Sequence, residues 1–104
     1  MKRVKNKIVY DTTKSELIST SNQILSVDEN PIFNLQIEIY KTPNNRWFYI
    51  NNGFGDPCVE EYFPELNFAQ IIPFENDDDV VRFLENNQEV EILEKYFPDK
   101  IEQA

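Results

Sequence analysis

The chain has 104 residues with no histidine and one cysteine, and its 19 acidic residues outnumber its 10 basic ones, giving a net charge of −9 at pH 7. This composition excludes catalysis that needs imidazole, zinc sites built from His or several Cys, and an internal disulfide. An acidic surface of this kind repels nucleic acid and anionic membranes, and it attracts basic grooves.

The apolar content of 40%, including 13% aromatic residues, is enough for one hydrophobic core, and we expect a single domain over residues 1–104. No apolar run is long enough to form a signal peptide or to span a membrane. The lone Cys58 suits a reducing compartment, so a cytoplasmic protein is expected.

Residues 1–74 are predicted to be rich in antiparallel strands. Two short strands, at residues 7–10 and 16–20, are expected to flank a polar loop at residues 11–15. The clearest strand comes next, because four apolar residues alternate with more polar ones: Phe33, Leu35, Ile37 and Ile39.

A hairpin should follow, because proline at the second position of segment 42–45 suits a type I turn. Pairing the two ends of this segment places Tyr40 opposite Trp47, on the same face as Tyr49. This aromatic face has two interpretations: the helices cover it as a second core layer, or it is exposed as a contact patch. The opposite, apolar face would contain Ile37, Ile39, Phe48 and Ile50.

The next residues are predicted to be mostly irregular. Asn52-Gly53 indicates a tight turn, and residues 56–68 form a connector rich in proline and aromatic residues. Cys58 has no basic neighbour to lower its pKa, so we expect a small buried residue, not a nucleophile. Residues 69–74 are predicted to be a last short strand, near a sheet edge or ending at Pro73.

Two helices are predicted in residues 76–97. Asn76 is a candidate N-cap, and three aspartates at positions 77–79 load the first turn, where the helix dipole favours negative charge. A metal-site interpretation of these aspartates is rejected, because two valines follow at once and no glycine is near.

The apolar stripe changes phase after residue 86, so the helix must break there. Asn86 and Glu89 have the spacing of a capping box for the second helix, and Pro98 should end it. We therefore expect an α+β fold, with an antiparallel sheet of about five strands and two C-terminal helices packed on one face.

Charge is distributed unevenly along the chain. Residues 1–14 contain five bases and one acid, whereas residues 56–104 contain fourteen acids and three bases. The acids are either an ordinary solvated surface or a surface that replaces phosphates in a basic groove. The candidate contact residues are Asp78, Asp79, Glu85, Glu91, Glu94, Glu60, Glu61 and Glu65, with Tyr40, Trp47 and Tyr49 as possible apolar anchors.

The basic N-terminal stretch also has two interpretations. Its lysines could contact phosphate, or they could protect an edge strand from pairing with another chain.

Three segments in order carry a family resemblance. These are Tyr10–Ile18 (YDTTKSELI), Ile39–Tyr49 (with IYKT and RWFY), and Ile71–Leu84 (with IIPF and VVRFL). Together they resemble small acidic proteins of Gram-positive phages and mobile elements, some of which are anti-CRISPR or anti-restriction inhibitors. The chain differs in its longer acidic C-terminal part, and the resemblance implies no catalytic residue.

The leading hypothesis is a non-enzymatic inhibitor that occupies the basic groove of a nucleic-acid-binding defence nuclease in the host cytoplasm. It would need no metal and no cofactor, and it would bind neither nucleic acid nor membrane directly. The alternative is an adaptor or antitoxin-like module that binds a protein through the aromatic hairpin face. A carboxylate- or Mg²⁺-dependent enzyme is disfavoured, because no acids converge on one site.

Overall fold

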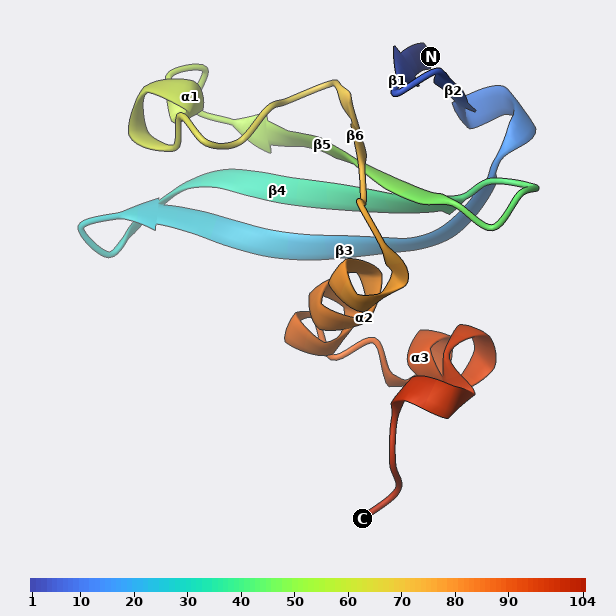
Figure 1. Cartoon of the computed structure of the whole chain (residues 1–104). Coiled ribbons are helices and arrows are strands. Elements are labelled where there is room, and N and C mark those ends of the chain that lie inside the picture. The colour runs from blue at the N-terminus through green and yellow to red at the C-terminus, as the bar shows by residue number, and fades with distance from the viewer. The chain divides into compact units, whose positions relative to one another are not determined.

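A computed structural model describes all 104 residues and confirms the α+β class, with antiparallel sheets and two helices at the C-terminal end (Figure 1). The six strands divide between two sheets: a two-stranded one and a four-stranded one. The strands are β1 (Lys2–Lys5), β2 (Ile8–Asp11), β3 (Glu16–Val27), β4 (Asn30–Lys41), β5 (Trp47–Gly55) and β6 (Ile71–Pro73). The helices are α1 (Val59–Tyr62), α2 (Asp77–Asn86) and α3 (Val90–Tyr96), with 3₁₀ turns η1 (Thr12–Lys14) and η2 (Pro98–Lys100).

The chain forms two compact units. Met1–Pro73, the strand-rich unit, holds both sheets and α1, and Phe74–Ala104, the helical unit, holds α2, α3 and η2.

Two hairpins in the strand-rich unit turn on residue pairs without glycine. Asn6 and Lys7 have φ values of 52° and 65°, and Asp28 and Glu29 have 51° and 68°. Positive φ at both central residues is the geometry of a type I′ turn, which matches the twist of the strands it connects. Because of the second turn, the strand predicted at residues 16–20 continues to Val27 and pairs with β4.

The predicted type I turn before β5 is confirmed, but the predicted strand register is wrong by one residue. The Asn45 N–H donates to the Thr42 carbonyl at 3.0 Å, and the Thr42 N–H donates to the Arg46 carbonyl at 2.8 Å. Asn45 has a φ of 61°, so it is an extra, left-handed residue of the kind that forms a G1 bulge. Tyr40 therefore pairs with Phe48, and Ile39 pairs with Tyr49.

The tight turn predicted at Asn52-Gly53 is also wrong, because both residues lie inside β5. Gly53 pairs with Leu35 and Gly55 with Phe33, at φ values of 144° and 145°. A Cβ on Gly53 would lie 2.0 Å from the Asn34 carbonyl oxygen and 2.7 Å from the Phe33 ring. The glycines therefore allow a close approach of β4, which no larger residue could permit.

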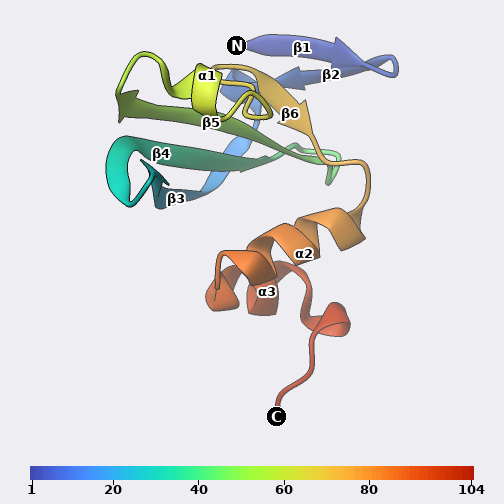
Figure 2. The same cartoon turned by 90° about the vertical axis from the view of Figure 1, so that its left-hand side faces the viewer.

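The β1–β2 hairpin contributes to the core of the strand-rich unit and lies over β5 and β6 in Figure 2. Tyr10 packs edge-on against Phe48 at 5.8 Å, and Ile50 and Ile71 complete this buried cluster. The Arg3 guanidinium donates to the Ile71 carbonyl at 2.5 Å and so ties β1 to β6. As predicted, β6 lies at an edge of its sheet and ends at Pro73.

The N-cap at Asn76 is confirmed: its side-chain oxygen accepts from the Asp79 N–H at 2.9 Å. The predicted break is confirmed too, and it follows a Schellman motif with Gln88 at φ 55°. The Glu89 N–H donates to the Leu84 carbonyl at 2.9 Å, and the Gln88 N–H donates to the Glu85 carbonyl at 3.0 Å.

The predicted capping box of α3 is wrong, because Asn86 still belongs to α2. The N-cap of α3 is Glu89, whose side chain makes no capping bond. The prediction that Pro98 limits the second helix is confirmed, since α3 ends at Tyr96 and Pro98 begins η2.

Candidate functional site

The first turn of α2 concentrates negative charge, but two of its aspartates have basic partners within the helical unit. Asp79 pairs with Arg82 at 3.1 Å, and Asp78 pairs with Lys100 at 2.9 Å. The hydrogen bond from Lys100 and its charge lower the pKa of Asp78, and the same contacts raise the pKa of Lys100. Both predicted contact residues are therefore partly neutralised before any partner arrives.

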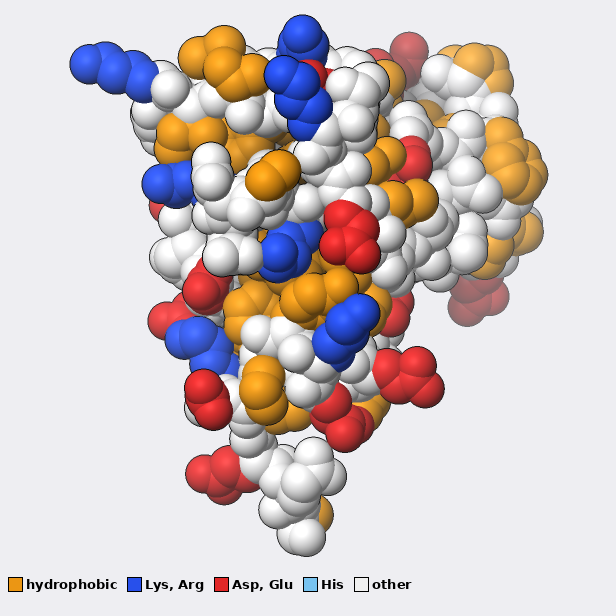
Figure 3. Space-filling model, turned by 90° about the vertical axis from the view of Figure 1, so that its right-hand side faces the viewer, with side chains coloured by type: hydrophobic (Ala, Val, Ile, Leu, Met, Phe, Trp, Pro, Cys, Tyr) orange, Lys and Arg blue, Asp and Glu red, His pale blue; other side chains and the backbone are white.

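Three other acids of the helical unit have no such partner. Glu85 on α2 and Glu91 and Glu94 on α3 are exposed, and no basic group lies within 4.0 Å of their carboxylates. Figure 3 shows acidic side chains projecting from this part of the chain. These three glutamates are the predicted contact residues of the helical unit that form no ion pair.

The remaining predicted acids lie in the strand-rich unit. Glu60 and Glu61 occupy the first turn of α1, Glu65 follows it, and all three are exposed. The Asp56 carboxylate accepts from the Cys58 N–H at 2.8 Å and so starts this turn.

Cys58 is exposed, contrary to the expectation of a buried residue. The prediction placed it in an irregular connector, and the one-turn helix α1 directs Val59 inward in its place. The charges of Glu61 and Asp56 raise the pKa of the Cys58 thiol, which disfavours the nucleophilic thiolate.

The three aromatic residues predicted to share one face are separated by the observed register. Trp47 and Tyr49 alternate with Phe48 and lie opposite Lys41 and Ile39, whereas Tyr40 is opposite Phe48 on the other side of the sheet. The Tyr40 ring stacks on Phe48 at 4.9 Å.

None of the three aromatic residues is fully exposed. Trp47 is only 4% exposed, and Tyr40 and Tyr49 are half-buried. The Tyr40 hydroxyl donates to Glu38 at 3.2 Å. Burial raises the pKa of both tyrosines, and the charge of Glu38 adds to the effect at Tyr40.

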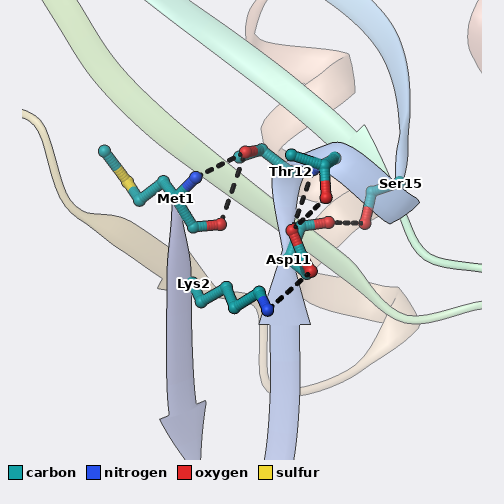
Figure 4. A network of polar contacts seen from close by, with 6 residues as sticks. Met1, Lys2, Asp11, Thr12 and Ser15 are labelled. Carbon is teal, nitrogen blue, oxygen red and sulfur yellow. Dashed lines mark hydrogen bonds and ion pairs between the residues drawn. The ribbon is translucent and has the colours of Figure 1, made fainter.

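A polar network that was not predicted from the sequence surrounds Asp11 (Figure 4). Its carboxylate accepts from the Thr13 hydroxyl at 2.8 Å and from the Thr13 N–H at 2.9 Å, and the Ser15 hydroxyl donates to the Asp11 carbonyl at 2.7 Å. The Thr13 bonds lower the pKa of Asp11, and the nearby charges of Lys2 and Lys14 lower it further. The sequence signal was the Asp-Thr-Thr run, which we assigned to a loop without assigning it a site.

No group of three or more acidic or cysteine side chains is arranged to hold a metal ion. None of the helices has the length and apolar character that a membrane span requires. The chain matches no protein-family model, and no curated protein or solved structure is significantly similar to it.

Proposed function

We propose that the protein is a non-enzymatic inhibitor of a nucleic-acid-binding defence nuclease, of the anti-CRISPR or anti-restriction kind, acting in the host cytoplasm. The acidic surface of its helical unit would occupy the basic groove in which the nuclease holds its nucleic acid.

The observation that carries this proposal is the set of uncompensated carboxylates Glu85, Glu91 and Glu94. Glu91 and Glu94 are three residues apart on α3, which corresponds to about 4.5 Å along the helix axis. The phosphates of one nucleic-acid strand follow one another at about 3.4 Å along the axis. Glu91 and Glu94 therefore offer the lysines and arginines of a groove two negative charges at a spacing somewhat wider than that of phosphates.

Charge also decides how such a complex forms. The helical unit contains ten acids and three bases, so a basic groove attracts it over a distance of about one Debye length. Inhibition should therefore weaken steeply as salt concentration rises, because salt screens the attraction and reduces the free energy gained when counterions are released.

The test compares two triple variants that remove the same charge. E85Q/E91Q/E94Q changes the helical unit, and E16Q/D28N/E29Q changes three exposed acids of the strand-rich unit. DNA cleavage by a panel of purified RNA-guided and restriction nucleases is measured at low and at physiological salt. The first variant should inhibit at least about tenfold less well, and the second within about twofold of the unmodified protein.

The proposal fails if no nuclease of the panel is inhibited, or if both triple variants lose inhibition equally. Circular dichroism of each variant checks that the fold is intact. Retention of inhibition at about 1 M salt would argue against a charge-based mechanism, since the Debye length is then only about 3 Å.

The alternative function, an adaptor that binds through Tyr40, Trp47 and Tyr49, has no observation in its favour. The three rings do not form one face, and Trp47 is almost fully buried. Substitution of Trp47 by alanine would act through core packing before it acted on a partner.

A further inference from the structure

A cavity of about 650 Å³ lies in the strand-rich unit, between the β1–β2 hairpin, η1 and the β4–β5 turn. Four basic residues from separate segments line it: Lys2, Lys7, Lys14 and Arg46. The only acidic residue in the lining is Asp11. In a chain of net charge −9, this one cavity is lined with a clear excess of positive charge.

Three of these four bases have no acidic partner. No carboxylate lies within 4.0 Å of Lys7, Lys14 or Arg46, although the chain has almost twice as many acids as bases. Lys2 alone approaches an acid, with 3.8 Å between its ammonium nitrogen and Asp11 Oδ2. Like charges that lie close together repel one another, and a bound anion would relieve the repulsion among these bases.

Asp11 compensates the other three bases only in part, because its charge interacts with Lys14 at a distance and it forms no ion pair with Lys7, Lys14 or Arg46. Its side chain is 6% exposed and is engaged by Thr13 inside the turn, where Figure 4 shows it beside Lys2. Lys7, Lys14 and Arg46 are all exposed and therefore able to reach a ligand.

The rest of the lining suits a small organic anion. Ile8, Val9 and Pro43 add apolar surface that the organic part of such a ligand can contact. The Arg46 N–H donates to the Thr42 hydroxyl oxygen at 3.0 Å, which holds the backbone of Arg46 at the cavity. Cavities of about 300–1,000 Å³ are typical of small-ligand sites.

We propose that this cavity binds a small ligand that carries two or more phosphate groups. Three cations without an ion-pair partner can match the charge of a pyrophosphate group, and the planar guanidinium of Arg46 can donate two parallel hydrogen bonds to phosphate oxygens. A nucleic-acid polymer is less well suited, because the acids that dominate the rest of the sequence would repel its flanking phosphates. This proposal does not depend on the proposed inhibitor function.

The test titrates the full-length protein with inorganic pyrophosphate, orthophosphate and sulfate by isothermal calorimetry, at low and at physiological salt. We expect pyrophosphate to bind at least about tenfold more tightly than either single anion, because it can engage all three cations together. An NMR titration should show the largest amide shifts at η1 and in the β4–β5 turn.

The variants K14Q and R46Q should each weaken pyrophosphate binding about tenfold. K95Q is the matched control, because it removes the same charge from an exposed base of α3 that does not line the cavity. It should change the affinity by less than about twofold. Each of the three substitutions removes one positive charge, and each should change nuclease inhibition only by the small amount that this change in net charge causes.

Three results would each overturn the proposal. One is the absence of pyrophosphate binding at about 10 mM. A second is an equal loss of affinity in K95Q, which would indicate only non-specific attraction. The third is tighter binding of a single-stranded oligonucleotide than of pyrophosphate, which would identify a polymer site. Thermal melting of each variant separates loss of binding from loss of fold.

Discussion

Gly53 is a position where one added methyl group should disrupt the sheet. The residue has a φ of 144°, and a Cβ would lie 2.0 Å from the Asn34 carbonyl oxygen. Gly53→Ala must therefore strain the backbone and also push β4 and β5 apart. We expect the free energy of unfolding to fall by at least about 2 kcal/mol, as measured by urea denaturation followed by circular dichroism.

The adjacent Phe54 provides the control for this substitution. Its side chain is 62% exposed, so Phe54→Ala should change the free energy of unfolding by no more than about 0.5 kcal/mol. If Gly53→Ala lowered the free energy of unfolding no more than Phe54→Ala, the two strands could not approach each other at Gly53 as closely as described.

At the scale of single elements, the C-terminus of α2 contains a strained residue. Gln88 has a φ of 55° at the Schellman position that glycine usually occupies. Gln88→Gly should relieve this strain and stabilise α2 by about 1 kcal/mol, although it removes the side-chain bond from Gln88 to the Glu85 carbonyl. Amide hydrogen exchange of Leu84 and Glu85 should slow accordingly.

Gln88→Ala separates the two effects of that substitution. Alanine removes the same side-chain bond but keeps the unfavourable φ, so exchange of the α2 amides should be unchanged or faster. Equal stabilisation by alanine and glycine would contradict the assignment of strain to the backbone of Gln88.

Elements with strong local signals could be predicted from the sequence, whereas strand register could not. The alternation from Phe33 to Ile39 and the cap at Asn76 act through their own neighbours, and both predict the observed structure. The register of β4 and β5 depends on whether Asn45 adopts a left-handed conformation, which nothing in its immediate sequence requires. The left-handed conformation of Asn45 shifts the register by one residue, so Tyr40 and Trp47 lie on opposite faces of the sheet.

The extent of β3 was missed for a related reason. Its turn to β4 uses Asp28 and Glu29 at positive φ, where the usual signal is Asn-Gly or Asp-Gly. The turn predicted at Gly53 was wrong for the reverse reason: the usual turn signal, Asn-Gly, is present there, but the glycine allows close packing of two strands.

At the scale of the whole molecule, the two units differ in charge. The helical unit has ten acids and three bases, and the strand-rich unit has nine acids and seven bases. Repulsion within the helical unit should weaken as salt rises from about 10 to 200 mM, because the Debye length shortens from about 30 to 7 Å. We expect amide exchange in α2 and α3 to slow over this range more than exchange in β4 and β5.

The variant E85Q/E91Q checks the cause of this salt effect. With two uncompensated charges removed from the helical unit, its salt dependence should become smaller. A salt effect of equal size in both units would mean that self-repulsion in the helical unit is not responsible.

The candidate sites were predictable only as far as charge could be counted along the chain. Counting identified Glu85, Glu91 and Glu94, but it did not show that Asp78 has a partner, since Lys100 is 22 residues away. The pair of Asp79 with Arg82, three residues apart on one helix, was within reach of the sequence. The basic cavity was not predicted, because Lys7, Lys14 and Arg46 come together only through the folding of separate hairpins.

The net charge of the protein also affects whether β3 can pair with a second copy of the chain. β3 is an edge strand of the larger sheet, and its residues from Leu17 to Val27 include no charged side chain, no proline and no glycine. Edge strands without charged residues or proline can pair with the same strand of another copy, and the pairing of β3 with β4 shifts register at two places. At pH 7 each copy repels the next, but near the isoelectric point of about 4.4 that repulsion vanishes. We therefore expect the acidity that we assign to partner binding also to oppose the association of one copy with another.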